Sequence, residues 1–199
     1  MNLPNKLTIF RIILVPMMVI IPFFGINGEY LDIPITYLII DLIFIIASIT
    51  DKLDGNIARS RNQVTNFGKF LDPIADKILV LSAMIMLVEF GRLPSFIPII
   101  ILFREFAVSG YRLIEATNGG KVIAASIWGK VKTVTQMLAV IAAYFNTGNL
   151  FECFYGEMGG LNFAMNFFES ILMIACVIAT CFSGWDYLKG GKELILKDK

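Results

Sequence analysis

The chain has 199 residues and a net charge of +1, 57% of its residues are hydrophobic, and its mean hydropathy is +0.74. This composition is too apolar for an ordinary soluble domain and predicts one compact all-α membrane domain over residues 1–199. The lysines and arginines are dispersed along the chain and form no basic stripe, which argues against a nucleic-acid partner.

The sequence contains no histidine. Nucleophiles activated by histidine are therefore excluded, and a general base has to be a carboxylate or a lysine, with carboxylates favoured. The three cysteines, Cys153, Cys176 and Cys181, form no CxxC pair. We interpret them as packing residues and not as zinc ligands.

Six apolar segments are candidates for bilayer-spanning helices, which need about 20 mostly apolar residues. In chain order they cover residues 7–24, 34–53, 71–90, 94–114, 122–146 and 163–187. Arg11 interrupts the first segment and no small-residue cleavage site follows, so we expect it to remain as a helix. The sequence Gly-Arg-Leu-Pro at 91–94 predicts a tight turn between antiparallel third and fourth helices.

The positive charges are shared unevenly between the two ends of the predicted bundle. If the N-terminus is cytoplasmic, that end receives most of the lysines and arginines, whereas the opposite loops contain Arg92 and four acids. An excess of lysine and arginine is typical of cytoplasmic loops. We therefore predict a multi-pass protein of the cell membrane with both termini, and the acidic cluster described next, at the cytoplasmic face.

The segment DKLDGNIARSRNQVTNFGKFLDPIAD at 51–76 contains four aspartates. If the second helix continues past the membrane, positions 51, 54, 55 and 58 share one stripe of it, and Asp72 and Asp76 share a face of the third helix. Clustered carboxylates suit hard cations such as Mg²⁺ or Mn²⁺. Gly55 and Ala58 leave room for a nucleotide beside the helix backbone. Taken singly, these residues are also typical of solvated helix ends and of helix packing.

Eight positions in this segment carry a resemblance to a known family. They are Asp51, Asp54, Gly55, Ala58, Arg59, Gly68, Asp72 and Asp76. Their spacing matches in full the signature DxxDG, two residues, AR, eight residues, GxxxDxxxD, and so resembles the CDP-alcohol phosphatidyltransferase family. The resemblance implies a six-helix membrane enzyme, usually a homodimer, in which an alcohol acceptor displaces CMP from a CDP-linked lipid with two divalent metal ions.

The resemblance also implies roles for these residues. The metal ligands would be Asp51, Asp54, Asp72 and Asp76. The nucleotide contacts would be Asp54, Gly55, Ala58, Arg59 and Gly68. Asp76 would in addition be the catalytic base that takes the acceptor proton. These roles agree with the chemistry of the residues, because attack on a diphosphate requires neutralisation of the phosphoryl oxygens.

Basic residues outside the signature indicate which alcohol is the acceptor. Arg104 lies near the middle of the fourth predicted span, where an arginine is a candidate functional residue. Arg112 lies eight residues further along on a similar helix face. Lys130 and Lys132 begin the fifth span. Four cations near the aspartates would suit an acceptor that carries its own phosphate.

A second interpretation gives these cations structural roles. Arg104 would then pair with Glu105 or Asp41, and the two lysines would anchor a helix end at the lipid headgroups. Segments 2–15 and 51–136 favour phosphate binding, because they resemble the glycerol-3-phosphate 3-phosphatidyltransferase branch of the family. This closer resemblance implies CDP-diacylglycerol and sn-glycerol 3-phosphate as substrates, with phosphatidylglycerophosphate and CMP as products.

The opening segment contributes a further expected contact. Asn2, Asn5, Thr8 and Arg11 are expected to line the cytoplasmic entrance of the site. On this interpretation, we expect Thr8 to contact the acceptor. Asn5 and Thr8 are equally typical of helix starts.

Three other functions share some of these features. A synthase of the same family could use serine, inositol phosphate or phosphatidylglycerol as its acceptor. Intramembrane prenyltransferases also hold magnesium diphosphate with aspartates, but in two distant motifs, whereas the four acids here fall within 26 residues. A cation transporter would place acids near the bilayer midplane, where only Asp41 is expected. Metal-dependent release of CMP separates the enzyme from the transporter.

Overall fold

The computed structural model describes residues 2–60, 66–117, 127–146, 148–156 and 158–197. Its long helices are α1 (Leu3–Ile20), α2 (Ile35–Ser60), α3 (Asn66–Glu89), α4 (Phe96–Thr117), α5 (Ile127–Phe145) and α7 (Gly160–Lys197). The shorter elements are η1 (Ile21–Phe24), β1 (Glu29–Tyr30), β2 (Ile33–Pro34) and α6 (Glu152–Tyr155). The all-α prediction is confirmed for the described residues, apart from the two short strands.

The boundaries of the long helices differ from those expected in ways that have local causes. α1 begins at Leu3 instead of residue 7, because Pro4 in its first turn is already set for helical geometry. α2 continues to Ser60, beyond the apolar run that marked its predicted end. α7 likewise runs to Lys197. Hydropathy locates the apolar part of a helix, and polar residues can extend it.

The connections at one end of the bundle are short turns. β1 pairs antiparallel with β2 through Leu31 and Asp32, both at positive φ, as in a two-residue hairpin turn. Gly91 ends α3 with φ +73, and its N–H donates to the carbonyl of Val88 while the next N–H reaches Leu87. This is a Schellman cap, and it confirms the tight turn predicted at 91–94.

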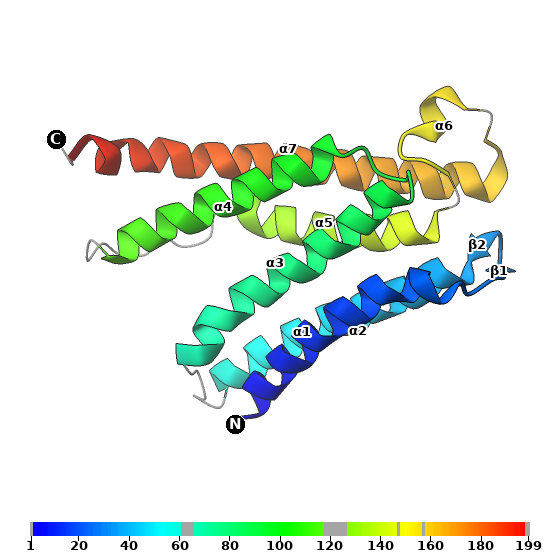
Figure 1. Cartoon of the computed structure of the whole chain (residues 1–199). Coiled ribbons are helices and arrows are strands. Elements are labelled where there is room, and N and C mark those ends of the chain that lie inside the picture. The colour runs from blue at the N-terminus through cyan, green and yellow to red at the C-terminus, as the bar shows by residue number, and fades with distance from the viewer. Residues whose placement is uncertain (1, 61–65, 118–126, 147, 157, 198–199) are drawn as a thin grey trace.

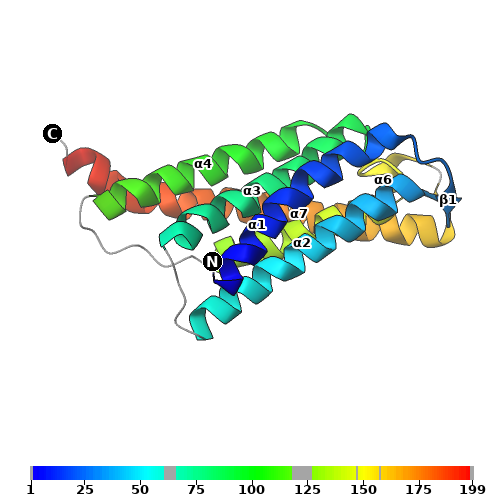
Figure 2. The same cartoon turned by 60° about the horizontal axis from the view of Figure 1, so that its bottom comes forward.

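α1 and α2 form one group of packed helices, α4, α5 and α7 form another, and both α3 and the contact between α2 and α5 join the two groups. α1 packs on α2 and α3, α5 packs on α7 and α2, and α4 packs on α7 (Figure 1). α3 runs obliquely between the α1–α2 pair and α4 (Figure 1). Figures 1 and 2 both place the two chain ends at one end of the bundle and the hairpin and α6 at the other.

Small side chains allow α5 and α7 to approach closely. Ala139 and Ala143 on α5, and Cys176 and Ala179 on α7, are all buried. Small residues permit such close backbone contact between helices in a membrane. Larger core side chains fill the rest of the interior, among them Met18, Ile40, Phe44, Leu79, Leu87, Ile101 and Met173.

Two segments of the described chain are long and apolar enough to cross a membrane on length and composition alone. They are Asn5–Phe24, with mean hydropathy 2.3, and Gly160–Tyr187, with mean hydropathy 1.9. α2, α3 and α4 are of sufficient length, but each contains several charged residues. The arrangement of six membrane spans therefore stays a prediction.

Candidate active site

Two of the signature aspartates contact a buried arginine from α1. The Arg11 side chain is 0% exposed, and its NH1 lies 2.6 Å from Oδ1 of Asp51 on α2 and 3.6 Å from Oδ1 of Asp76 on α3. A buried charge requires an opposite charge nearby, and here one guanidinium serves two carboxylates on different helices. Arg11 thus belongs to the centre of the acidic cluster, deeper than the entrance position expected from the sequence.

Thr8 lies one helical turn before Arg11 and contacts the third aspartate. Its hydroxyl donates a 2.6 Å hydrogen bond to Oδ1 of Asp72, and the residue is 1% exposed. Thr8 therefore contacts a carboxylate of the signature. It does not line the cationic cavity described below, where the other predicted acceptor contacts Arg104, Arg112 and Lys132 lie. Asn5, one turn earlier, is also buried and lies inside α1, not at its start.

The rest of the signature lies partly outside the described residues. The backbone of α2 is helical through Ser60, so positions 51, 54, 55 and 58 do share a stripe of one helix. The side chains of Asp54, Ala58 and Arg59, and the surroundings of Gly55, lie outside what the structure describes. Gly68 is buried in the first turns of α3. The predicted nucleotide contacts at these positions therefore stay predictions.

The donor set of the cluster fits hard divalent cations. Asp51, Asp72 and Asp76 present carboxylate oxygens, which are the ligands that Mg²⁺ and Mn²⁺ prefer. Within the described residues, no group of three His, Cys, Asp or Glu side chains is gathered closely enough to hold a metal by itself. The side chain of the fourth signature aspartate, Asp54, lies outside the described residues. Arg11 provides the compensating positive charge in the structure as it stands.

A cavity of about 210 Å³ opens beside Asp76, between α3, α4 and α5. The charged residues that line it are Asp76, Lys77, Arg104, Glu105, Arg112 and Lys132. These four cations and two carboxylates give the wall a formal net charge of +2. The uncharged polar residues of the lining are Ser109, Thr133 and Gln136. The cavity therefore favours an anionic ligand next to the predicted catalytic base.

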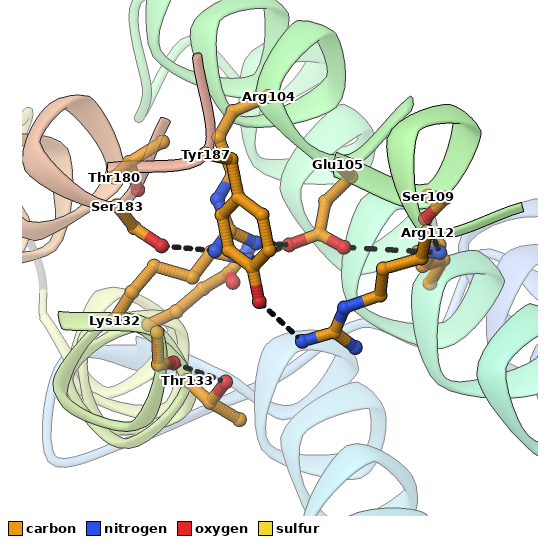
Figure 3. Close-up of polar contacts among 12 residues, drawn as sticks. Arg104, Glu105, Ser109, Arg112, Lys132, Thr133, Thr180, Ser183 and Tyr187 are labelled. Atoms are coloured by element: carbon orange, nitrogen blue, oxygen red, sulfur yellow. Dashed lines mark hydrogen bonds and ion pairs between the residues drawn. The ribbon is translucent and has the colours of Figure 1, made fainter. Parts of the chain in front are cut away.

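Glu105 contacts three of the four cations. One of its oxygens, Oε1, lies 2.5 Å from Nζ of Lys132 and 3.0 Å from NH1 of Arg104, and Oε2 lies 3.9 Å from Nζ of Lys77. Figure 3 shows this carboxylate between side chains that reach it from neighbouring helices. Lys77 also donates a 2.5 Å hydrogen bond to the hydroxyl of Ser109.

The two arginines are held in place by α7. Arg104 donates to the hydroxyl of Ser183, and Arg112 donates a 2.5 Å hydrogen bond to the hydroxyl of Tyr187 (Figure 3). Both guanidinium groups lie near the Tyr187 ring, at 5.8 and 5.4 Å from its centroid, respectively. Nε of each arginine is buried, and neither has a hydrogen-bond partner in the described part of the chain.

Comparison with known proteins identifies the family. A sequence model of the CDP-alcohol phosphatidyltransferases matches residues 1–182. The chain belongs to the CDP-alcohol phosphatidyltransferase family. It is 44% identical to the CDP-diacylglycerol–glycerol-3-phosphate 3-phosphatidyltransferase of Bacillus subtilis (strain 168), over 98% of this chain and 97% of that one.

Other members of the CDP-alcohol phosphatidyltransferase family also match over nearly the whole chain. The protein of the same name from Haemophilus influenzae is 38% identical over 98% of this chain and 96% of that one. A probable phosphatidylglycerophosphate synthase of Mycobacterium tuberculosis (strain ATCC 25618 / H37Rv) is 35% identical over 94% of this chain and 80% of that one.

The structure brings together some of the residues predicted for the acceptor site of this phosphatidyltransferase and separates others. Arg104, Arg112 and Lys132 line the same cavity as Asp76. Lys130 is exposed on α5 and is not part of that lining, so it does not join the three other cations. Two residues apart on a helix differ by about 200° in direction, which explains why only one of the two lysines faces inward.

Two charged residues of the cavity had no predicted role in the site. Lys77 directly follows Asp76, the last signature aspartate. This adjacency is the one sequence feature that could have indicated a role for Lys77 in the site. The sequence predicts Glu105 only as a possible ion-pair partner of Arg104, and the structure contains that ion pair. Asp41, the other partner considered for Arg104, is 1% exposed, and its oxygens have no hydrogen-bond partner among the described residues.

Proposed function

We propose that the chain transfers the phosphatidyl group of CDP-diacylglycerol to sn-glycerol 3-phosphate and forms phosphatidylglycerophosphate and CMP. The main support for this proposal is the cavity beside Asp76. Its wall has a net charge of +2, and two buried Nε donors in it lack partners within the described residues. A phosphate monoester has close to two negative charges and accepts several hydrogen bonds, so it complements both features.

The names of the relatives agree with this acceptor. The Bacillus subtilis and Haemophilus influenzae proteins are named for transfer to glycerol 3-phosphate. The phosphate group of the acceptor would bind Arg104, Arg112 and Lys132. Its primary hydroxyl would then point towards Asp76, since that carboxylate lines the same cavity.

In the proposed reaction, the residues of the acidic cluster take up the acceptor proton and bind the metal ions. The acceptor oxygen attacks the phosphorus that bears the diacylglycerol, the bond from that phosphorus to the CMP oxygen breaks, and Asp76 takes the hydroxyl proton. The residues that would hold two divalent cations are Asp51, Asp54, Asp72 and Asp76. When bound, such cations would neutralise charge on the diphosphate oxygens. Thr8 orients Asp72 for this role through its hydrogen bond.

The nucleotide is proposed to lie along the stripe of α2 that follows Asp51. Gly55 and Ala58 would leave space for it, and Arg59 would face the diphosphate. Asp54 and Gly68 complete the proposed nucleotide contacts. Gly55→Leu should stop turnover without unfolding the protein, since leucine is a better helix former than glycine.

The proposed setting is the cell membrane. The enzyme would cross it six times with both termini in the cytoplasm, and would act at the cytoplasmic face as a homodimer. Buried charges support this setting, since Arg11, Lys132 and Glu169 lie inside the bundle while many large apolar side chains lie outside. Such an apolar outer surface is unusual for a soluble protein and suits a lipid environment.

The reaction can be tested with purified protein, CDP-diacylglycerol, Mg²⁺ or Mn²⁺, and a panel of acceptors. The panel contains glycerol 3-phosphate, glycerol, serine, inositol phosphate and phosphatidylglycerol, and the readouts are CMP release and the lipid formed. We expect phosphatidylglycerophosphate with glycerol 3-phosphate and no product without metal. Product from another acceptor alone would overturn the acceptor and leave the reaction class intact.

Substitution of the aspartates tests the site. Asp51→Asn, Asp72→Asn and Asp76→Asn should each lose nearly all turnover, because each removes a carboxylate charge from the cluster. Asp76→Asn should retain part of its CDP-diacylglycerol binding, since the asparagine oxygen could still coordinate a cation although the proposed base is lost. Asp32→Asn, in the exposed hairpin turn, is the matched control and should behave as the unmodified enzyme.

A further inference from the structure

Glu105 lies against the cationic part of the cavity wall, and the proposed reaction gives it no role. Its carboxylate is within 4.0 Å of cations from three helices: Lys77 on α3, Arg104 on α4 and Lys132 on α5. An acid at this position repels a phosphate. Its presence in a cavity for an anion therefore requires another explanation.

The burial of the cations provides that explanation. The side chains of Lys132 and Arg104 are 6% and 12% exposed, so their charges are poorly screened by solvent and repel one another. A single carboxylate that contacts both removes much of this repulsion and directs both side chains to one place. Without it, a buried lysine charge would lack its partner.

Lys77 is the third cation that contacts Glu105, and it lies next to Asp76 of the acidic cluster in the sequence. It follows Asp76 on α3, lines the same cavity, and is held by Ser109 at 2.5 Å as well as by Glu105 at 3.9 Å. These contacts direct its ammonium group away from the cluster of aspartates and towards α4. Lys77 is thereby placed with the cations of the cavity.

We propose that Glu105 is a positioning residue that holds Lys77, Arg104 and Lys132 as one phosphate-binding unit for the acceptor. Lys77 becomes a further contact of the acceptor's phosphate. This inference rests on the proposed function and deepens it. Glu105 itself does not touch the acceptor, and acts through the three cations that it orients.

Glu105→Gln tests the positioning role because it keeps the shape of the side chain and removes its charge. We expect the KM for glycerol 3-phosphate to rise about tenfold, as for one lost charge-assisted hydrogen bond, with kcat and the KM for CDP-diacylglycerol unchanged. Inorganic phosphate, as a competitive inhibitor against glycerol 3-phosphate, should weaken by a similar factor. Glu89→Gln, an exposed acid at the end of α3, is the control and should change none of these values.

A double-mutant cycle separates positioning from a general structural effect. Lys132→Met should raise the KM for glycerol 3-phosphate in the unmodified enzyme, and should cost much less in the Glu105→Gln background, since the lysine is already misplaced there. Multiplicative effects of the two changes would overturn the proposal. If Glu105→Gln does not accumulate, the cycle of Lys77→Met with Lys132→Met replaces it. A shared anchor predicts coupling between these lysines, and independent effects would overturn it.

The outcomes also separate this inference from the function on which it rests. An unmodified enzyme that does not use glycerol 3-phosphate overturns both. An unmodified enzyme that uses it, together with Glu105→Gln that raises both KM values equally, overturns only the positioning role.

Discussion

Arg11 connects three helices through its charge. It comes from α1 and contacts Asp51 on α2 and Asp76 on α3, with no exposed surface of its own. Carboxylates that are to bind divalent cations repel one another when the cations are absent. Arg11 stabilises the cluster against this repulsion and would thereby keep the proposed metal site assembled before metal and substrate bind.

This role predicts how metal affects the stability of an Arg11→Met variant. In EDTA the variant should lose about 3 kcal/mol of stability, because the aspartates lose their buried counter-charge. Saturating Mg²⁺ should restore most of that loss, since the cation replaces the missing positive charge. Thermal unfolding in detergent, with EDTA or Mg²⁺, measures both values. Lys6→Met, an exposed change on the same helix, is the control, and an equal loss in both conditions would contradict the role.

Arg92 connects elements at the opposite end of the bundle. It lies in the α3–α4 turn, donates to the carbonyl of Asn146 after α5, and lies 5.0 Å over the ring of Tyr37 on α2. Asn146 in turn donates to the buried Glu169 on α7. The carbonyl of Arg92 accepts from the N–H of Leu150 at 3.0 Å. One turn residue therefore links the α3–α4 turn directly to α2 and to the end of α5, and through Asn146 to α7.

Arg92→Met should accordingly affect stability without affecting catalysis. We expect a loss of about 2 kcal/mol, as for a buried carbonyl left without its charged donor, and a lower unfolding temperature. The KM values for both substrates should not change, because the cationic cavity has none of these contacts in its lining. Lys189→Met, an exposed change on α7, is the matched control. A shifted KM for glycerol 3-phosphate with normal stability would contradict this assignment.

Large apolar side chains lie on the outer surface of the described helices, while a few charged side chains lie inside. Phe103, Phe106 and Trp185 are 77%, 66% and 67% exposed, whereas Arg11 and Glu169 are almost completely buried. Lipid is the solvent that accepts such a surface. The chain ends lie at one end of the bundle, and the hairpin and α6 lie at the other (Figures 1 and 2).

Single engineered cysteines test the predicted orientation in that membrane. In a variant without its three native cysteines, Lys189→Cys should react with a membrane-impermeant maleimide only after the cells are permeabilised. Glu29→Cys, in the hairpin, should react in intact cells. Both positions are exposed, so access from solvent and not burial decides the result. The reverse pattern would place the termini, and the site with them, outside the cytoplasm.

Sequence was sufficient for the features that depend on near neighbours along the chain. Apolar runs located the long helices, the Gly-Arg-Leu-Pro segment located the α3–α4 turn, and i, i+3, i+4 spacing placed Asp51 on the same stripe as Gly55. The family was also accessible, because eight spaced positions in one short segment form its signature. Helix ends were less accurate, since polar residues extend α2 and α7 beyond their apolar parts.

The pairing of side chains across helices was decided by the tertiary structure. The rotation of α5 brings Lys132 into the cavity and leaves Lys130 exposed. The offset between α1 and α3 brings Thr8 to Asp72 and places Arg11 inside the acidic cluster. Composition and spacing identify which charges are present, but the energy of a buried charge depends on what faces it from other helices. Those contacts follow from packing of whole helices, which no local pattern of residues encodes.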